Sequence, residues 1–316
     1  MSRRGWMLFA AMGVIWGIPY LLIKIAVDDL TPATLVLVRT SLATVLLLPL
    51  AIGRDELRPL LPRWRPLLVY TVIEICLPWL LLGYAEQDLS SSLTGLLVAA
   101  VPLVGAVLVK ATGHEPLGSR RVLGLLVGFA GVAALVGFDV GASSAGAVAA
   151  VGAVALCYAL GPLILARHLA DLPGLGVVAA SLAIAAVVYA PVGLLQWPDH
   201  AVGADTWWSV AGLAVICTAV AFLVFFELIA EVGPARATVI TYVNPAVALV
   251  LGVLVLDERV TLATGAGFAL ILAGSVLATA RERVPAEPAA VGVPAGGHDL
   301  GDVETDEMAA CPVPEP

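Results

Sequence analysis

Charged residues are scarce in this sequence. Asp, Glu, Lys and Arg make up 13% of its 316 residues, whereas 60% are hydrophobic and the mean hydropathy is +1.01. Soluble globular domains carry about 25% charged residues. The deficit therefore excludes an ordinary soluble domain and points to a chain that meets lipid.

Residues that carry metal, redox or nucleotide chemistry are also few. The sequence has four histidines and four cysteines, and neither set shows the spacing of a metal or redox site. It has no Walker A sequence, no nucleophile–base pair inside an apolar stretch and no basic stripe interleaved with aromatic residues. We therefore expect no enzyme activity, no metal, no cofactor, no nucleic-acid partner and no use of ATP by this chain.

Long apolar runs are what the sequence has in abundance. A helix needs about 20 apolar residues to cross a bilayer. Because lipid offers no hydrogen-bond partners, only helices or a closed barrel can cross it, and runs that do not alternate exclude the barrel. The sequence predicts an all-α membrane protein with ten transmembrane helices, at approximately residues 6–27, 32–52, 66–86, 92–110, 119–138, 145–167, 174–195, 207–230, 235–256 and 261–280.

The first run follows two arginines, Arg3 and Arg4, as the apolar core of a signal peptide would. It continues to about Val27, and no small-residue cleavage site ends it. We therefore expect a retained helix.

The two halves of the sequence repeat each other with an offset of 143 residues. This offset relates their landmarks: Pro19 and Pro162, Lys24 and Arg167, Pro102 and Pro245, Glu115 and Glu258, Gly124 and Gly267, and Gly131 and Gly274. Each half holds five spans, and an odd number makes the second copy enter the membrane in the opposite orientation. We expect inverted repeats at residues 1–140 and 141–283, an arrangement typical of secondary transporters.

Most of the sixteen basic residues fall on one side of the predicted spans. The positive-inside rule assigns that side, and with it both termini, to the cytoplasm of a bacterial cell. The basic residues on this side are Arg3, Arg4, Arg54, Arg58, Arg63, Arg65, Lys110, Arg120, Arg121, Arg167, Arg236, Arg281 and Arg283.

The C-terminal segment, residues 284–316, is rich in Pro, Gly and Ala and has no long apolar run. Residues 281–316 hold eight acidic and two basic residues, so much of the net charge of −8 lies there. This composition predicts a disordered cytoplasmic tail, either passive or regulatory.

Prolines inside the spans indicate where helices break. A helical proline cannot donate to the carbonyl group four residues earlier, and in lipid that carbonyl needs another partner or a water-lined cavity. Recurrence in both halves favours a shared site or hinge, and packing kinks are the alternative. The predicted break or hinge residues are Pro19, Pro78, Pro102, Pro162 and Pro245.

Two charged residues lie deep within the spans, where charge is costly and usually functional. At ~1.5 Å per residue, Glu74 lies about 12 Å from one boundary and Arg39 about 10 Å from the other, within reach of each other if their helices are neighbours. Their repeat mates are Cys217 and Leu182. A pair that only fixes helix register is the alternative, but a pair needed to build the fold would be expected in both halves. We expect Glu74 to be the coupling or substrate-ammonium group, with Arg39 tuning it.

Further polar and aromatic residues lie near the predicted breaks. Asn244 precedes Pro245 and follows Tyr242, so its amide contacts either a ligand or the freed backbone. Trp16 and Tyr20 share one face of the first helix, and Trp79 lies in the third. These aromatic residues line a pocket for an amphipathic ligand or pack in the core.

Small residues form a ridge in the fifth and tenth spans. Gly124 and Gly128 make a GxxxG pair with Gly131 close behind, and Gly267 and Gly274 repeat part of it. Such residues let helices approach closely in lipid. We expect packing within the chain, and contact with a second copy in a homodimer is the alternative.

These features resemble the EamA family of the drug/metabolite transporter superfamily, which has two tandem five-helix domains. The residues that carry the resemblance span positions 6–280 and are Trp16-Gly17, Arg39, Ser90–Pro102, Glu115…Gly124…Gly131 and Glu258…Gly267…Gly274. The sixth span lacks an obvious Trp-Gly and has Tyr158 and Gly161 instead.

The resemblance implies a ten-helix bundle that moves small organic metabolites or drug-like compounds across the cytoplasmic membrane, often outward, by alternating access. It also implies that the third, fourth, eighth and ninth helices line the cavity, which fits Glu74, Trp79 and Asn244. A non-transporting membrane scaffold or receptor of the same fold is the alternative function.

Overall fold

The computed structural model describes residues 2–111, 119–139, 144–233 and 237–279. Residues Met1–Ala280 form one compact unit. Glu115 and the predicted tail, residues 284–316, lie outside the described residues.

Every regular element that the described residues form is helical, in agreement with the expected fold class. The elements are α1 (Arg3–Ile15), α2 (Pro19–Ala26), α3 (Pro32–Gly53), η1 (Arg58–Arg63), α4 (Trp64–Thr71), η2 (Val72–Cys76), α5 (Leu77–Asp88), α6 (Ser91–Val98), α7 (Val101–Ala111), α8 (Ser119–Asp139), α9 (Ala145–His168), α10 (Gly174–Leu195), α11 (Ala204–Ala214), η4 (Val215–Val220), α12 (Ala221–Val232), η5 (Thr238–Tyr242), α14 (Asn244–Leu256) and α15 (Leu262–Thr279).

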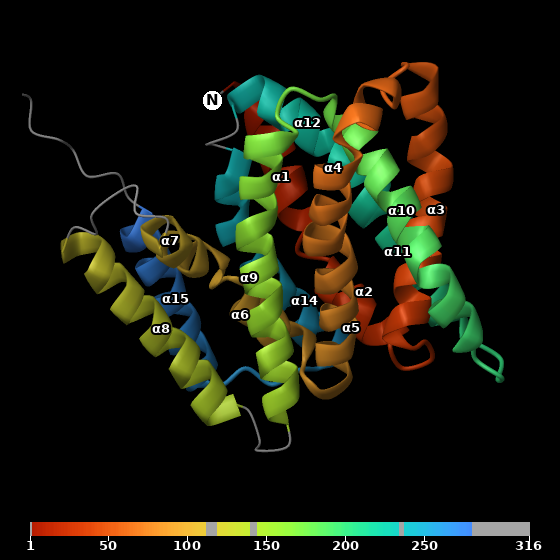
Figure 1. Ribbon diagram of the computed structural model, residues 1–316. Coiled ribbons are helices and arrows are strands. Elements are labelled where there is room, and N and C mark those ends of the chain that lie inside the picture. The colour runs from red at the N-terminus through yellow and green to blue at the C-terminus, as the bar shows by residue number, and fades with distance from the viewer. Residues whose placement is uncertain (1, 112–118, 140–143, 234–236, 280–316) are drawn as a thin grey trace, which may run out of the picture. The chain divides into compact units, whose positions relative to one another are not determined.

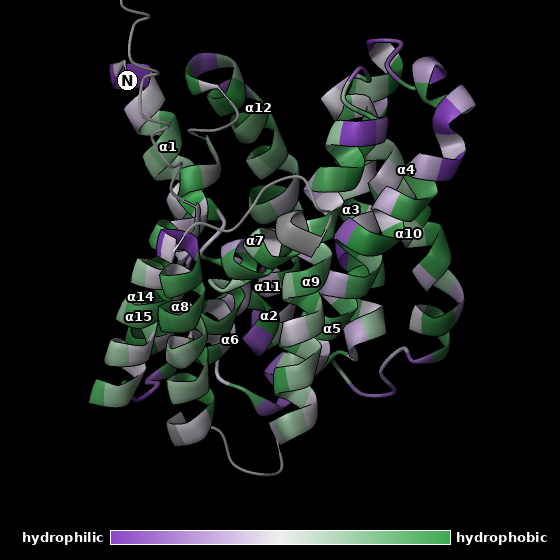
Figure 2. Cartoon of the chain, turned by 60° about the vertical axis from the view of Figure 1, so that its left-hand side comes forward, coloured by the Kyte–Doolittle hydropathy of each residue, from purple (hydrophilic) through white to green (hydrophobic). Residues whose placement is uncertain are grey.

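These elements combine into ten helical segments that are long and apolar enough to cross a membrane, as expected. The third begins earlier than predicted, at Arg58, and continues to Asp88. Large apolar side chains remain exposed along the helices, such as Leu195 at 87% and Leu262 at 95%. Hydrophobic colour runs along the helices and hydrophilic colour gathers at loops and helix ends (Figure 2). Such a surface suits lipid rather than water.

Helices of the two halves pack against each other rather than forming separate bundles. The main contacts join α3 to α10, α6 to α14, α8 to α15, α5 to α9, and α1 and α2 to α12 and α11 (Figure 1). The compact unit is therefore built from interleaved halves.

The glycine ridge brings α8 and α15 into backbone contact. A Cβ added to Gly124 would lie 2.8 Å from the carbonyl oxygen of Gly274, and one added to Gly131 would lie 2.7 Å from that of Gly267. Because this face of α8 is occupied by α15 of the same chain, these glycines serve packing within the chain.

Acidic side chains in the loops cap helices of the other half. Oε1 and Oε2 of Glu258 accept hydrogen bonds from the backbone N–H groups of Ser91 (2.7 Å) and Ser92 (2.9 Å). Glu258 precedes α15 in the sequence, yet it caps α6 because the α14–α15 loop passes beside the N-terminus of α6. Thr261 caps α15 instead, by accepting from the backbone N–H of Thr264 at 3.0 Å.

The α2–α3 loop makes a similar contact with α11. Oδ2 of Asp29 accepts hydrogen bonds from the Thr206 hydroxyl at 2.7 Å and from the Gly203 backbone N–H at 2.8 Å. The hydrogen bond from Thr206, then that from Gly203, lowers the pKa of the Asp29 carboxyl, and His200 lowers it further. The ionised form of Asp29 is therefore the one that ties the two halves together.

We expect Gly274→Ala to destabilise the protein. Its Cβ would overlap backbone atoms of Gly128 and lie 2.6 Å from the Gly124 carbonyl oxygen. Overpacking of this kind costs about 1–3 kcal/mol. The matched control is Gly265→Ala on the same helix, where a Cβ meets nothing within 4 Å. Thermal unfolding in detergent should show a lower Tm for the first variant only. Equal Tm values would contradict the close approach of α8 and α15.

We expect Asp29→Asn to lower stability at neutral pH and to matter less in acid. Because the folded state lowers the pKa of Asp29, the carboxylate stabilises the protein above the pKa of an unfolded aspartate, about 3.9. That contribution is lost as the pH falls through the lower folded value. Tm should be measured against pH for wild type, Asp29→Asn and the control Asp199→Asn, whose side chain is exposed. A Tm difference between wild type and Asp29→Asn that does not shrink on acidification would contradict this assignment.

Candidate substrate site

Two π-helical turns interrupt the third and eighth spans at equivalent positions. η2 begins at Val72 and η4 at Val215, an offset of 143 residues. Single-turn π segments inside α-helices are rare and are frequent at functional sites. The recurrence indicates that both halves keep this irregularity, although their side chains there differ.

Side chains of neighbouring elements satisfy carbonyl groups at these turns. The Tyr189 hydroxyl, on α10, donates to the Cys76 carbonyl oxygen at 2.9 Å. The Thr218 hydroxyl, within η4, donates to the Leu213 carbonyl oxygen at 2.7 Å. These two carbonyl groups are thus paired with protein atoms, as the interior of a membrane protein requires.

Four of the five prolines predicted to break helices lie where a helix begins. Pro19 begins α2, and Pro78, Pro102 and Pro245 lie in the first turns of α5, α7 and α14. α9 continues through Pro162 without interruption, contrary to the predicted break. A proline removes one hydrogen bond from a helix, and neighbouring residues in a bundle can compensate for that loss.

Arg39 lies near the middle of the bundle on α3, with only 6% of its surface exposed. Its Nε donates to the Thr218 hydroxyl at 3.1 Å, and its Cζ lies 3.6 Å from the centroid of the Trp79 ring. A guanidinium group over an indole face is a favourable cation–π arrangement. The structure therefore brings Arg39 and Trp79 together. The second partner of Arg39, the hydroxyl group of Thr218, comes from the other half of the chain.

The expected ion pair between Arg39 and Glu74 is not formed: in the described part of the chain, no carboxylate oxygen lies within 4.0 Å of the Arg39 guanidinium. The Arg39 guanidinium group contacts Trp79 and Thr218 instead. The positions of Glu74 and Arg39 along their helices indicated similar depths in the membrane. They could not show the direction in which each side chain points.

Glu74 lies within η2 and packs against α9. Its Oε2 atom is buried and has no hydrogen-bond partner among the described residues. The carboxyl group occupies the space beside Gly161, where an added Cβ would overlap Oε2 and lie 2.8 Å from Cδ. Gly161, which with Tyr158 stands in the sixth span in place of an obvious Trp-Gly, therefore makes room for this carboxyl group.

The aromatic residues of the first span have separate environments. Trp16 lies at the end of α1, with its ring centroid 4.7 Å from that of Phe225 on α12. Tyr20 lies on α2 and its ring packs against Gly95 on α6. The predicted shared face assumed a continuous helix, but the break between α1 and α2 turns the two rings toward different neighbours.

Asn244 and Tyr242 are already engaged near the break between η5 and α14. In the amide orientation that satisfies its hydrogen bonds, Asn244 donates to the carbonyl oxygens of Gly13 (3.1 Å) and Ile240 (3.0 Å). The Tyr242 hydroxyl lies 3.1 Å from Thr279 Oγ1. Of the two interpretations open at sequence level, these contacts favour satisfaction of the broken backbone by Asn244.

Sequence reasoning missed two polar residues of this region. Thr218 follows Cys217, the repeat mate of Glu74, and this position was the signal that could have identified it. Glu86 lies at the end of the third span, where a charged residue is unremarkable in sequence, yet it is fully buried. Only the packing of other helices over α5 reveals Glu86.

Comparison with known proteins agrees with this architecture. "Uncharacterized transporter YvbV" of Bacillus subtilis (strain 168) is 26% identical over 296 residues, covering 91% of this chain and 95% of that protein. "Uncharacterized inner membrane transporter YedA" of Escherichia coli (strain K12) is 29% identical over 253 residues, covering 77% and 79% respectively. A crystal structure that is 20% identical superposes with a TM-score of 0.63 over 88% of this chain and 98% of its own, and shares the fold.

A family model, the EamA-like transporter family, matches residues 3–137 and 145–280, which together account for most of the sequence. The two matches fall on the two halves that the offset of 143 residues relates. They also include all ten apolar helices of this multi-pass membrane protein. This chain belongs to the EamA-like transporter family.

Proposed function

We propose that this protein is a secondary carrier of the bacterial cytoplasmic membrane that exports small organic metabolites or drug-like compounds by alternating access. The observation that carries the proposal is the pair of π turns, one in each half, in a chain whose family consists of transporters. Irregular backbone at membrane depth is tolerated where it lines a cavity or is buried in protein, and transporters place binding sites at such breaks.

The halves are proposed to be inverted repeats that rock around this central region. Equivalent spans contact each other across the halves, as α3 does with α10, α6 with α14 and α8 with α15. The first span contacts the eighth, through α1 with α12 and α2 with α11. The equivalent contact, between the third and the sixth spans, is made by α5 and α9. Reciprocal contacts of this kind are what a two-fold relation produces.

We propose Glu74 as the group that receives a substrate ammonium. A buried carboxylate oxygen without a partner, such as Oε2 of Glu74, is costly, and a cationic solute would remove that cost by supplying the missing donor. Arg39 cannot neutralise it directly, because Arg39 is held by Trp79 and Thr218. Arg39 instead fixes the Trp79 ring.

The proposed topology predicts opposite locations for two equivalent loops. Alkaline phosphatase, which is active only outside the cytoplasm, should be inactive when fused after Asp55 and active when fused after Asp199. A green fluorescent protein fused to the C-terminus should fluoresce. If the fusions after Asp55 and after Asp199 showed the same phosphatase activity, the inverted arrangement would be overturned.

We expect Glu74→Gln to reduce export of cationic solutes about tenfold or more, since a hydrogen bond to a charged group contributes about 1.5–3 kcal/mol. Intact cells with and without the protein would be loaded with a pool of labelled metabolites, and the exported compounds would be identified by mass spectrometry. The variant should lose cationic members of the exported set and keep neutral ones.

The matched control is Glu227→Gln, which removes a carboxylate that is paired with Arg4 at 2.5 Å and exposed. It should leave the exported set unchanged. A Glu74→Gln variant that exports every cationic solute at the wild-type rate would refute the role of Glu74. If wild-type cells export nothing beyond cells that lack the protein, the carrier proposal fails and a scaffold or receptor becomes the better explanation.

A further inference from the structure

Glu86 is a fully buried acid in the last turn of α5. Its side chain has 0% exposure, and neither Oε1 nor Oε2 has a hydrogen-bond partner among the described residues. An ionised carboxylate in such a place would lose its hydration without compensation, so the group is neutral as long as it stays enclosed. A neutral carboxyl group holds a proton that it releases once water reaches it.

The nearest cation is committed to the backbone rather than to this carboxyl group. Nζ of Lys24, on α2, donates to the carbonyl oxygens of Glu86 (2.6 Å) and Leu89 (3.0 Å) at the C-terminal end of α5. No ion pair joins Lys24 to the Glu86 side chain within 4.0 Å. Lys24 nevertheless lies close enough to act on it electrostatically, as does Glu258 with the opposite sign.

Other titratable groups around α5 are few. Tyr20 on α2 lies close enough to Glu86 to interact with it electrostatically, and so does Tyr158 on α9 with Tyr20. Arg39 on α3 is engaged by Trp79 and Thr218, and Glu74 lies in the preceding η2 turn. α6 contributes no titratable group, but its Ser91 and Ser92 hydroxyls are buried and have no partner among the described residues.

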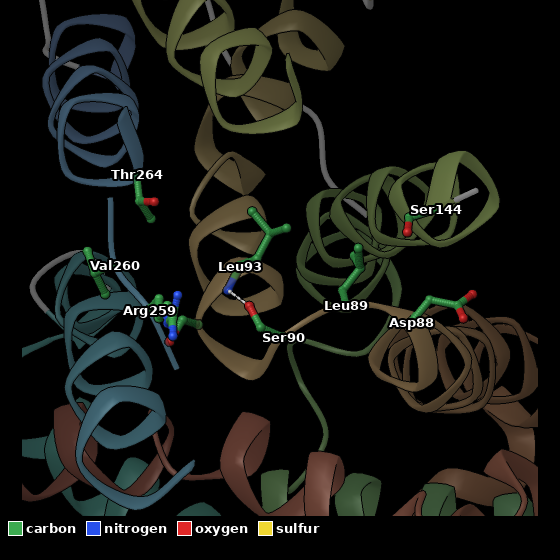
Figure 3. Close-up of a pocket in the computed structure, with 9 residues that line it drawn as sticks. Asp88, Leu89, Ser90, Leu93, Ser144, Arg259, Val260 and Thr264 are labelled. Carbon is green, nitrogen blue, oxygen red and sulfur yellow. Dashed lines mark hydrogen bonds between the residues drawn. The ribbon is translucent and has the colours of Figure 1, made fainter. Parts of the chain in front are cut away.

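A cavity lies at the end of α5 that carries Glu86, since Asp88 and Leu89 line it. A Cβ added to Gly252 on α14 would meet Oε2 of Glu258 and both serine hydroxyls, so the three groups share one space. The cavity, of about 190 Å³, adjoins them and is lined by Asp88, Leu89, Ser90, Ser92, Ser144 and Arg259, among others (Figure 3). It begins two residues after Glu86, and Ser92 belongs both to the cavity and to the buried hydroxyl pair.

We propose that Glu86 is a proton-binding site that exchanges its proton with solvent through this cavity. When the α5–α6 end of the bundle opens, water hydrates the carboxyl group, which passes its proton to water and becomes a carboxylate close to Lys24. When that end closes, the carboxylate takes a proton from water and is enclosed as the neutral acid. The coupling of this exchange to solute movement rests on the proposed function, and the proton site itself does not.

Infrared difference spectroscopy of the purified protein, labelled with isotopic glutamate, tests the proposal with protons as the probe. Spectra in acidic and alkaline buffers should show a protonated glutamate carbonyl band that converts reversibly into carboxylate bands. Glu86→Gln should lose one such band, whereas Glu74→Gln should retain it. An unchanged difference spectrum in Glu86→Gln, or a wild-type protein with no titrating buried glutamate, would overturn the proposal.

A second variant and a salt series complete the test. Should Glu86→Gln not fold, Glu86→Asp should move the band from the labelled to the unlabelled carbonyl region, and a labelled band that stays would refute the assignment. If the glutamate band changed with sodium concentration at constant pH, Glu86 would be a cation site and the proton-site proposal would be wrong. No transported solute is used, so a failure of the export screen and a failure of this experiment are distinguishable.

Discussion

The absence of hydrogen-bond partners in lipid is the constraint on which the rest of this structure depends. Each interruption of a span frees backbone groups that protein atoms must satisfy. Tyr189 does this at the π turn of the third span, Thr218 at that of the eighth, and Asn244 at the start of α14. These compensating groups gather polar atoms at membrane depth. The helix breaks therefore create the polar interior in which a site can exist.

The same constraint explains why neither half is a unit by itself. The N-terminus of α6 needs an acceptor from the α14–α15 loop, and that of α11 needs one from the α2–α3 loop. α8 presents a glycine face that α15 covers. A single repeat would expose these groups to lipid or water. The loop carboxylates of Glu258 and Asp29 therefore join the two halves at these two contacts.

Much of the fold follows from local properties of the sequence. The number of spans depends on the length of the apolar runs, and the offset of 143 residues revealed the two repeats that the family model also matches. The continuity of α9 through Pro162 was not predictable, because neighbouring helices decide whether a proline breaks a helix. The depth of Glu74 and Arg39 within their spans identified them as candidate site residues. Their partners, however, depend on the direction of each side chain and on residues of the second half, such as Thr218 and Gly161. Glu86 was missed because burial at the end of a span arises only when α2 and α6 pack over it.

In the third span, Oε2 of Glu74 and both side-chain oxygens of Glu86 lack hydrogen-bond partners among the described residues, and their surroundings suit them to different tasks. Glu74 and Glu86 are twelve positions apart, about 18 Å along a helix at ~1.5 Å per residue. The Glu74 carboxyl group lies beside Gly161, and among the described residues no cation lies within 4.0 Å of it, so a solute is the natural source of its partner. Glu86 lies beside Lys24 and near a cavity, so water can relieve it without a solute. A span that holds both groups can respond to solute at one level and to protons at another, because the two carboxyl groups lie at different depths.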